Sequence, residues 1–255
     1  MTASPTGDAL AAVELADLAG ERLLEVRRRL MDTGLTGVEV KDAGDAAAQE
    51  VLARALAQRF PDDAVLSEEA ADDLQRLQAD RVWIIDPLDG TREFSEPGRD
   101  DWAVHVALWQ RGALTDAAVA LPARGVTFST AMTPAVDTSG QDGALRLAVS
   151  RSRPPAFVTS LAERIGAELV AMGSAGVKAM SVLTGETDAY VHAGGQYEWD
   201  SAAPVAVARA AGLATSRLDG SPLTYNNANP YLPDLVICRA QVHDMLLQQI
   251  AGLQP

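Results

Sequence analysis

Hydrophobic residues in the first quarter of the chain repeat with the 3.6-residue period of amphipathic helices. Small and apolar side chains share one face over residues 8–30, and a glycine-containing loop ends this first helix. A second apolar face covers residues 48–56, with Asp45 as the predicted N-cap and Pro61 as the stop. Two helices are therefore predicted before any strand.

Beyond Pro61 the pattern changes to short apolar runs with the two-residue alternation of β-strands. The alternation is clearest at Val104, Val106 and Leu108. We expect these strands to form one sheet that the two helices cover. The predicted strands span residues 65–66, 81–85, 103–109, 115–121 and 126–130.

Strand-like and helical runs alternate after residue 145, which is typical of an α/β arrangement. A polar segment with proline and glycine, Thr133–Gly143, precedes this part. We therefore predict an N-terminal α+β subdomain over residues 1–140 and a C-terminal α/β subdomain over residues 141–255. The second is predicted to contain strands 145–150 and 168–172 and helices 156–165, 175–183, 201–211 and 241–253.

The composition limits the class of protein. With 255 residues and 47% hydrophobic positions, the chain can bury a large core. A formal net charge of −14 argues against a surface for polymeric nucleic acid, because phosphate backbones are held mainly by clustered lysine and arginine. An acidic protein acting on a small phosphate ester would need bound cations to offset the repulsion.

Cysteine and histidine usage excludes two further classes. Cys238 is the single cysteine and lies in an apolar run, so we expect a buried thiol and no disulfide framework. The histidines His105, His192 and His243 do not have zinc-ligand spacing. The N-terminus lacks a signal-peptide pattern and no apolar segment reaches membrane-spanning length, which predicts a cytoplasmic protein without membrane contact.

Candidate chemistry is concentrated at the end of the second predicted strand, in the string Asp86-Pro-Leu-Asp-Gly-Thr-Arg-Glu93. Pro87 cannot donate to a β-ladder, so strand pairing is predicted to stop at Asp86. Gly90 permits a tight turn, and Thr91 is the predicted N-cap of a helix whose free N–H groups would face an anion.

The two aspartates of this string can converge on a cluster of cations. The carbonyl of Leu88 would be a further ligand to the ions held by Asp86 and Asp89, and an all-oxygen site selects Mg²⁺ or Mn²⁺ over zinc. An ordinary Asp-Gly turn with solvated carboxylates explains a single such dipeptide. It does not explain two carboxylates, a free carbonyl and a hydroxyl together, so we predict a metal site that holds phosphate.

The string Asp86–Phe94 resembles the signature of the Mg²⁺-dependent, lithium-sensitive inositol monophosphatase superfamily. Leu66-Ser-Glu-Glu-Ala70 resembles its paired-glutamate element, and Glu198-Trp-Asp-Ser-Ala-Ala203 resembles its Trp-Asp element. The continuation Arg92-Glu93-Phe94 is similar to the 3′(2′),5′-bisphosphate nucleotidases of the CysQ type. The resemblance implies the layered αβαβα sandwich of inositol monophosphatase and fructose-1,6-bisphosphatase, with the active site between its two halves.

The resemblance also implies a set of metal ligands. Glu68 would reach the first metal and the attacking water, while Glu69 would point to the opposite face. Capping of a helix explains Asp200 by itself, and the order of the three motifs favours metal ligation as well. Two or three Mg²⁺ ions, replaceable by Mn²⁺, would be held by Glu68, Asp86, the Leu88 carbonyl, Asp89 and Asp200.

The implied reaction is in-line attack of water on phosphorus without a phosphoenzyme. Thr91 would orient or deprotonate the water. In the family an aspartate within Asp-x-Val-Thr-x-x-Asp supports that threonine; here Glu39 takes the place of the aspartate and Asp42 that of the threonine, and either could accept the proton. Asp45 is assigned to capping alone, and Glu68, Asp89 and Thr91 are the predicted catalytic residues.

Gly173-Ser174 with Lys178 resembles a Gly-Ser-x-x-x-Lys element near the nucleotide of bisphosphate nucleotidases. Its donors would face a second phosphate that is bound and not cleaved; a capped helix with a solvated lysine is the alternative. The residues predicted to contact the substrate are Gly90, Thr91, Arg92, Ser174, Lys178, His192 and Asp200.

The leading functional prediction is removal of the 3′-phosphate of 3′-phosphoadenosine 5′-phosphate, and also of 3′-phosphoadenylyl sulfate, which recycles a by-product of sulfate activation. The alternatives are an inositol-1-phosphate or fructose-1,6-bisphosphate phosphatase and a non-catalytic metal or nucleotide sensor. The presence of Thr91 beside all four metal carboxylates argues against the sensor. A homodimer is compatible with the sequence.

Overall fold

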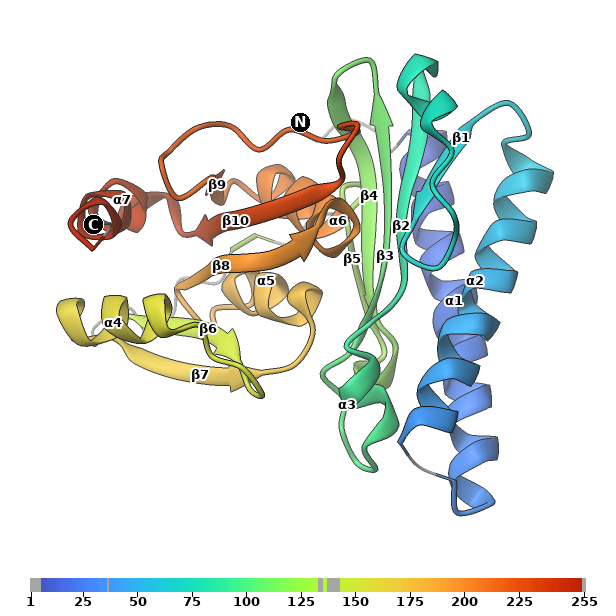
Figure 1. The fold of residues 1–255 in the computed structure, drawn as a ribbon, viewed down its shortest axis with the longest axis horizontal. Helices are drawn as coiled ribbons and strands as arrows, with labels where there is room; N and C mark the ends of the chain where they lie inside the picture. The colour runs from blue at the N-terminus through green and yellow to red at the C-terminus, as the bar shows by residue number, and fades with distance from the viewer. Residues whose placement is uncertain (1–5, 36, 133–134, 137–142, 254–255) are drawn as a thin grey trace.

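Two long helices form one outer layer of the protein (Figure 1). The computed structural model describes residues 6–35, 37–132, 135–136 and 143–253. Helix α1 (Gly7–Asp32) begins after Thr6, whose Oγ1 accepts a hydrogen bond from the N–H of Ala9 at 3.0 Å. Helix α2 (Val38–Arg59) packs beside α1, and both cover one face of the first sheet. The two predicted helices are confirmed.

Helix α2 begins well before the predicted start, so the assignment of Asp45 as its N-cap is wrong. Gly37 precedes the helix with φ +72°, a conformation open to glycine, and turns the chain into α2 at once. Asp45 therefore lies inside the helix. Gly44 packs against the segment Asp86–Phe94, which we call the motif loop, because a Cβ at residue 44 would lie 2.6 Å from Phe94 and 2.8 Å from Leu88.

The first sheet has the strand order β1-β2-β3-β4-β5 and is buried on both faces. Strand β1 runs parallel to β2, and the other pairs are antiparallel. Alternation separates the faces of β2: Trp83 and Ile85 pack with α1 and α2, whereas Val82 and Ile84 face the opposite side. The strands are β1 (Ala64–Ser67), β2 (Arg81–Asp89), β3 (Ala103–Gln110), β4 (Ala113–Leu121) and β5 (Val126–Ser129).

The second sheet has the order β7-β6-β8-β10-β9. Helices α5 (Ala175–Leu183) and α6 (Glu198–Ala210) lie between the two sheets, and α4 (Ala156–Ile165) and α7 (His243–Ala251) form the outer layer (Figure 1). The predicted αβαβα sandwich is confirmed. The strands are β6 (Arg146–Ser150), β7 (Glu168–Met172), β8 (Ala189–Tyr197), β9 (Ala214–Ser216) and β10 (Tyr231–Cys238), of which the last three in sequence were not predicted.

Short helices complete the fold: η1 (Leu74–Gln78), α3 (Thr91–Ser95), η2 (Pro122–Arg124) and η3 (Ala240–Val242). Cys238 is buried as predicted. Most of the predicted boundary segment 133–143 lies outside the described residues, so the division at residues 140 and 141 stays a prediction. Within the described ranges, every helix is too short or too polar to cross a membrane.

Candidate active site

The metal motif lies on an irregular end of β2. Pairing does not stop at Asp86 as predicted, because β2 continues through Pro87 to Asp89. Asp86 pairs with His105 and Asp89 with Ala103, and the register shifts between these two pairs. Pro87 lies within the irregularity, where its missing N–H costs no ladder bond. The N–H of Leu88 donates to Asp86 Oδ1 at 3.0 Å and fixes that carboxylate.

Gly90 makes the turn into α3, so the prediction that Thr91 is the N-cap is wrong by one residue. Gly90 has φ +88°, and a Cβ there would lie 3.3 Å from the Asp101 carbonyl oxygen and from Ser174. Its left-handed conformation and the close approach both favour glycine. Thr91 is the first helical residue, where its N–H has no partner within the helix.

Asp86, Asp89 and Asp200 converge, and we call these three residues the acidic centre. One carboxylate oxygen from each lies within 4.8 Å of the others. Asp200 is the third residue of α6 and its Oδ2 accepts the N–H of Tyr197 at 2.7 Å. Tyr197, and not Asp200, is therefore the N-cap, although Asp200 satisfies a free N–H at the start of the helix as a capping residue would.

The acidic centre is electrostatically unfavourable without a cation. Burial raises the pKa of Asp86 well above its ordinary value, and the charges of Glu68 and Asp89 raise it further. Burial and Asp89 raise the pKa of Asp200 to about 8. Burial of the carboxyl and Asp89 also raise the pKa of Glu68, directly after β1, to about 7.

The residues present fit a hard divalent cation. Asp86 Oδ2 is buried and accepts no hydrogen bond from the described residues. Every acidic group at the centre is an oxygen donor, the type that Mg²⁺ and Mn²⁺ prefer. A divalent cation would supply both the missing partner and the missing positive charge.

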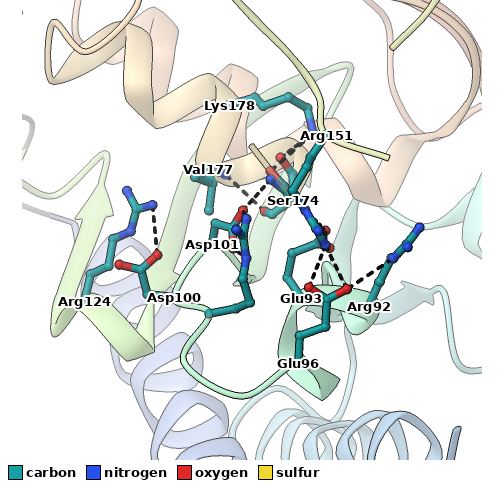
Figure 2. Close-up of polar contacts among 12 residues, drawn as sticks. Arg92, Glu93, Glu96, Asp100, Asp101, Arg124, Arg151, Ser174, Val177 and Lys178 are labelled. Atoms are coloured by element: carbon teal, nitrogen blue, oxygen red, sulfur yellow. Dashed lines mark hydrogen bonds and ion pairs between the residues drawn. The ribbon is translucent and has the colours of Figure 1, made fainter. Parts of the chain in front are cut away.

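The start of α5, in the second half of the chain, binds Asp89. Ser174 Oγ and the N–H of Gly176 both donate to Asp89 Oδ2, the latter at 2.8 Å. Ser174 has φ +49°, and its Oγ also accepts the N–H of Val177 at 3.1 Å (Figure 2). Gly173 precedes it, and its N–H donates to Asp101 at 2.6 Å. Ser174, predicted as a substrate contact, thus lies directly against a predicted metal ligand.

Lys178 is buried, so the alternative of a solvated lysine is wrong. Only 6% of the residue is exposed, and Nζ donates to the carbonyls of Ser174 at 2.6 Å and Gly173 at 3.3 Å. Nζ also lies 5.4 Å from the centre of the Tyr190 ring. Burial lowers the pKa of Lys178. Contact with a phosphate stays a prediction.

Salt bridges surround α3. Arg151 reaches from the end of β6 to Glu93 at 2.8 Å and Glu96 at 2.9 Å (Figure 2). Arg92 is exposed and pairs with Glu96 at 3.3 Å. His192 lies on β8, where its ring nitrogen Nε2 donates to the carbonyl of Gly194 at 2.7 Å, and burial lowers its pKa to about 4. Substrate contacts of Arg92 and His192 stay predictions.

Asp45, in the first turns of α2, interacts electrostatically with the paired glutamates. Burial raises the pKa of Asp45 to about 7, and the charges of Glu69 and Asp42 contribute to this rise. Glu39 and Asp42, in the same turns of the helix, are exposed. The charge of Asp45 in turn raises the pKa of Glu68. The sequence placed the start of the helix at Asp45 and therefore assigned this residue to capping alone. It did not predict that Asp45 lies near Glu68 and Glu69.

A network built around the buried residues Arg76, Glu198 and Asn226 holds the segment before Asp200. Glu198 accepts hydrogen bonds from the N–H groups of Asn226 at 2.6 Å and Asn227 at 2.9 Å. Arg76 on η1 donates to Asn226 at 2.6 Å and to Asp72 at 2.7 Å. The sequence did not reveal this network, since its members are distant along the chain and belong to no common motif.

The model of the inositol monophosphatase family matches residues 8–253. The chain belongs to the inositol monophosphatase family. This family is metal-dependent, so membership makes the protein a metal-dependent phosphatase with an acidic triad that could bind the metal. The match covers both sheets and every element of the site.

The curated relatives of this chain include proteins named as phosphatases of nucleotide bisphosphates. The chain is 56% identical over 241 residues to a protein of Mycobacterium bovis named 3′-phosphoadenosine 5′-phosphate phosphatase, covering 91% of this chain and 89% of the relative. It is 30% identical to the 3′(2′),5′-bisphosphate nucleotidase CysQ of Escherichia coli, with coverage of 74% and 81%. The Thermotoga maritima IMPase has a similar fold, with a TM-score of 0.77, 20% identity and coverage of 97% and 98%.

Proposed function

We propose that this protein removes the 3′-phosphate of 3′-phosphoadenosine 5′-phosphate by attack of water, with 3′-phosphoadenylyl sulfate as a further substrate. The observation that carries the proposal is the acidic centre of Asp86, Asp89 and Asp200, in a chain 56% identical to a phosphatase named for this substrate. The substrate is a small anion, and an acidic protein binds it where cations locally reverse the charge.

Two or three divalent cations would be held by the acidic centre together with Glu68 and the carbonyl of Leu88. When bound, Mg²⁺ or Mn²⁺ lowers the pKa of a water and stabilises negative charge on the phosphoryl oxygens and the leaving oxygen. We propose Mg²⁺ as the ion used. The raised pKa values of Glu68 and Asp200 support it, because these carboxylates are poorly stabilised without positive charge.

The turn at Gly90 supplies the contacts to the phosphate that is cleaved. The N–H groups of Gly90 and Thr91 precede or begin α3 and have no partners within the helix, so they can donate to phosphoryl oxygens. Thr91 would orient the attacking water with its hydroxyl. Glu39 or Asp42 would accept its proton, and Asp45, partly buried near Glu69, is a third candidate.

The second phosphate would lie near the start of α5. Ser174, Lys178 and Arg92 would supply its donors, and His192 a contact to phosphate or base. Lys178 Nζ binds two carbonyls of the same turn, so its charge lies at the start of α5. A homodimer stays a prediction.

The proposed activity is tested by phosphate release with Mg²⁺ from 3′-phosphoadenosine 5′-phosphate, inositol-1-phosphate and fructose-1,6-bisphosphate, compared by kcat/KM. We expect strong preference for the nucleotide. Preference for a polyol phosphate would keep the metal chemistry and overturn the substrate. Release from none of them would favour the non-catalytic sensor.

A second measurement separates the roles of Lys178. Lys178→Met keeps most of the side-chain volume and removes the charge, and its KM is compared for 3′-phosphoadenosine 5′-phosphate and for 3′-AMP, which lacks the 5′-phosphate. A larger increase in KM for the bisphosphate is the expected result. An equal effect on both substrates would remove Lys178 from the second phosphate and assign it to the Ser174 turn.

A further inference from the structure

His105 is a fully buried histidine at the acidic centre that no sequence motif indicates. It lies on β3 with 0% exposure, opposite Asp86 in the β2–β3 ladder. Its Nε2 is 3.3 Å from Asp89 Oδ2, and its Nδ1 is 3.9 Å from Asp86 Oδ2. Its Nδ1 is also 3.1 Å from the carbonyl oxygen of Trp199. One side chain therefore contacts β2 and the start of α6.

The direction of the bond to Trp199 is set by its chemistry. A carbonyl oxygen only accepts, so Nδ1 of His105 carries a proton and donates it. This bond sets the orientation of the imidazole, whose Nε2 edge then faces Asp89 and α5. The space on that edge exists because residue 176 is glycine: a Cβ there would lie 2.2 Å from Nε2. Three elements thus enclose the ring and hold it in one orientation.

The bond matters because Trp199 immediately precedes Asp200 in the chain. Asp200 is the one member of the acidic centre that comes from α6. Asp86 and Asp89 belong to β2 and are positioned by the first sheet. A donor on β3 that binds the backbone next to Asp200 connects the two sources of carboxylates at the point where they meet.

We propose that His105 is a positioning residue that holds the start of α6 against β2 and thereby sets the affinity of the acidic centre for divalent cations. The inference rests on the metal site of the proposed function and not on the choice of substrate. Without the bond, the backbone at Trp199 loses a fixed partner and Asp200 is free to move relative to Asp86 and Asp89. Groups that orient metal ligands in this way typically change metal affinity about 10–100-fold when removed.

Three substitutions test the bond itself. Asparagine carries its amide nitrogen on Cγ, the atom that carries Nδ1 in histidine, so His105→Asn retains a donor toward Trp199. His105→Gln moves the amide one bond further, to the position of the Nε2 edge, and His105→Leu removes the donor and keeps an apolar side chain of similar size. The Asn and Gln variants have side chains of the same polarity. They differ in the distance of the amide donor from the backbone.

The readout is Mn²⁺ binding to the metal-free protein, followed by electron paramagnetic resonance of the free ion. Since orientation of a metal ligand is worth about 10–100-fold, we expect His105→Gln and His105→Leu to bind Mn²⁺ more weakly by roughly that factor, and His105→Asn within about threefold of wild type. Wild-type affinity in the Gln or Leu variant would overturn the proposal, as would an Asn variant as weak as the Leu variant.

Folding is monitored by circular dichroism and thermal unfolding of the metal-free variants. If His105→Leu does not fold, the Asn and Gln variants decide the question, since both place a polar amide in the same space. Failure of the wild-type protein to bind Mn²⁺ would instead overturn the metal site itself. The two failures are therefore distinguishable.

Discussion

Replacing Asp200 with asparagine removes one negative charge from the acidic centre and keeps the size of the side chain. The amide oxygen of asparagine can still accept the N–H of Tyr197, which binds Asp200 Oδ2 at 2.7 Å. The substitution therefore isolates the charge of Asp200. We expect opposite effects on the free energy of unfolding with and without metal. Without metal the variant should be more stable than the wild type, and with metal it should be less stable because one metal ligand is lost.

The magnitude follows from the pKa of Asp200, which burial and Asp89 raise from the ordinary 3.8 to about 8. The folded state then binds the proton more tightly than the unfolded state, so the contribution of Asp200 to stability is fully present below about pH 4 and is lost as pH rises from about 4 to about 8. A tenfold change in proton affinity is worth about 1.4 kcal/mol, which sets a ceiling of about 6 kcal/mol. After solvation and rearrangement we expect a gain of about 2–3 kcal/mol for the variant at pH 8.

The assay is urea unfolding at pH 5 and pH 8 with a chelator, and again at pH 8 with Mg²⁺. The advantage of Asp200→Asn should be large at pH 8, should shrink at pH 5 and should reverse with Mg²⁺. Asp62→Asn, at an exposed position on the surface, is the control for the loss of any one carboxylate. A wild type as stable as the Asp200 variant at pH 8 without metal would refute the reasoning, as would equal stabilisation of both by Mg²⁺.

Three further changes have defined outcomes. Asp89→Asn should reduce phosphate release by orders of magnitude with the fold intact, because ligation and charge are lost together; near-normal turnover would exclude Asp89 from the site. Gly176→Ala should cost about 1–3 kcal/mol in thermal unfolding because its Cβ would meet His105, whereas Gly7→Ala, which meets nothing within 4 Å, should be nearly neutral; equal effects would argue against the packing. Arg76→Met should cost about 1–3 kcal/mol in urea unfolding by leaving the buried Oδ1 of Asn226 unpaired, and a loss under about 0.5 kcal/mol would show that the network is dispensable.

Local sequence determined the helix α1, the strands of the first sheet and the metal motif. The continuous apolar run in β2 reflects burial of both faces of this sheet. The alternation in β3 places Val104, Val106 and Leu108 on the face that packs against α1 and α2. The string Asp86–Glu93 contains its carboxylates, turn residue and hydroxyl within one short loop, so its chemistry could be recognised without knowledge of the fold.

The sequence predictions were wrong or incomplete where contacts between distant segments, and not local residue patterns, determine where an element begins. Helix α2 begins at Val38 because Gly37 turns the chain and α3 and the motif loop cover its first turns, although its residues there are mostly polar. Strands β8 and β10 were not predicted because glycines and polar residues interrupt them at Gly194 and Asp234. Each is held by pairing with strands that are distant in the sequence.

Tertiary structure alone decided how the site is assembled. Asp89 and Asp200 are far apart in the sequence and meet because α6 packs between the two sheets. The same packing buries Lys178, whose Nζ donates to the carbonyls of Gly173 and Ser174, and places His105 between β2 and α6. Residue types specify which ligands and donors are present, since their chemistry is intrinsic; which of them face one another depends on long-range packing, which no local pattern encodes.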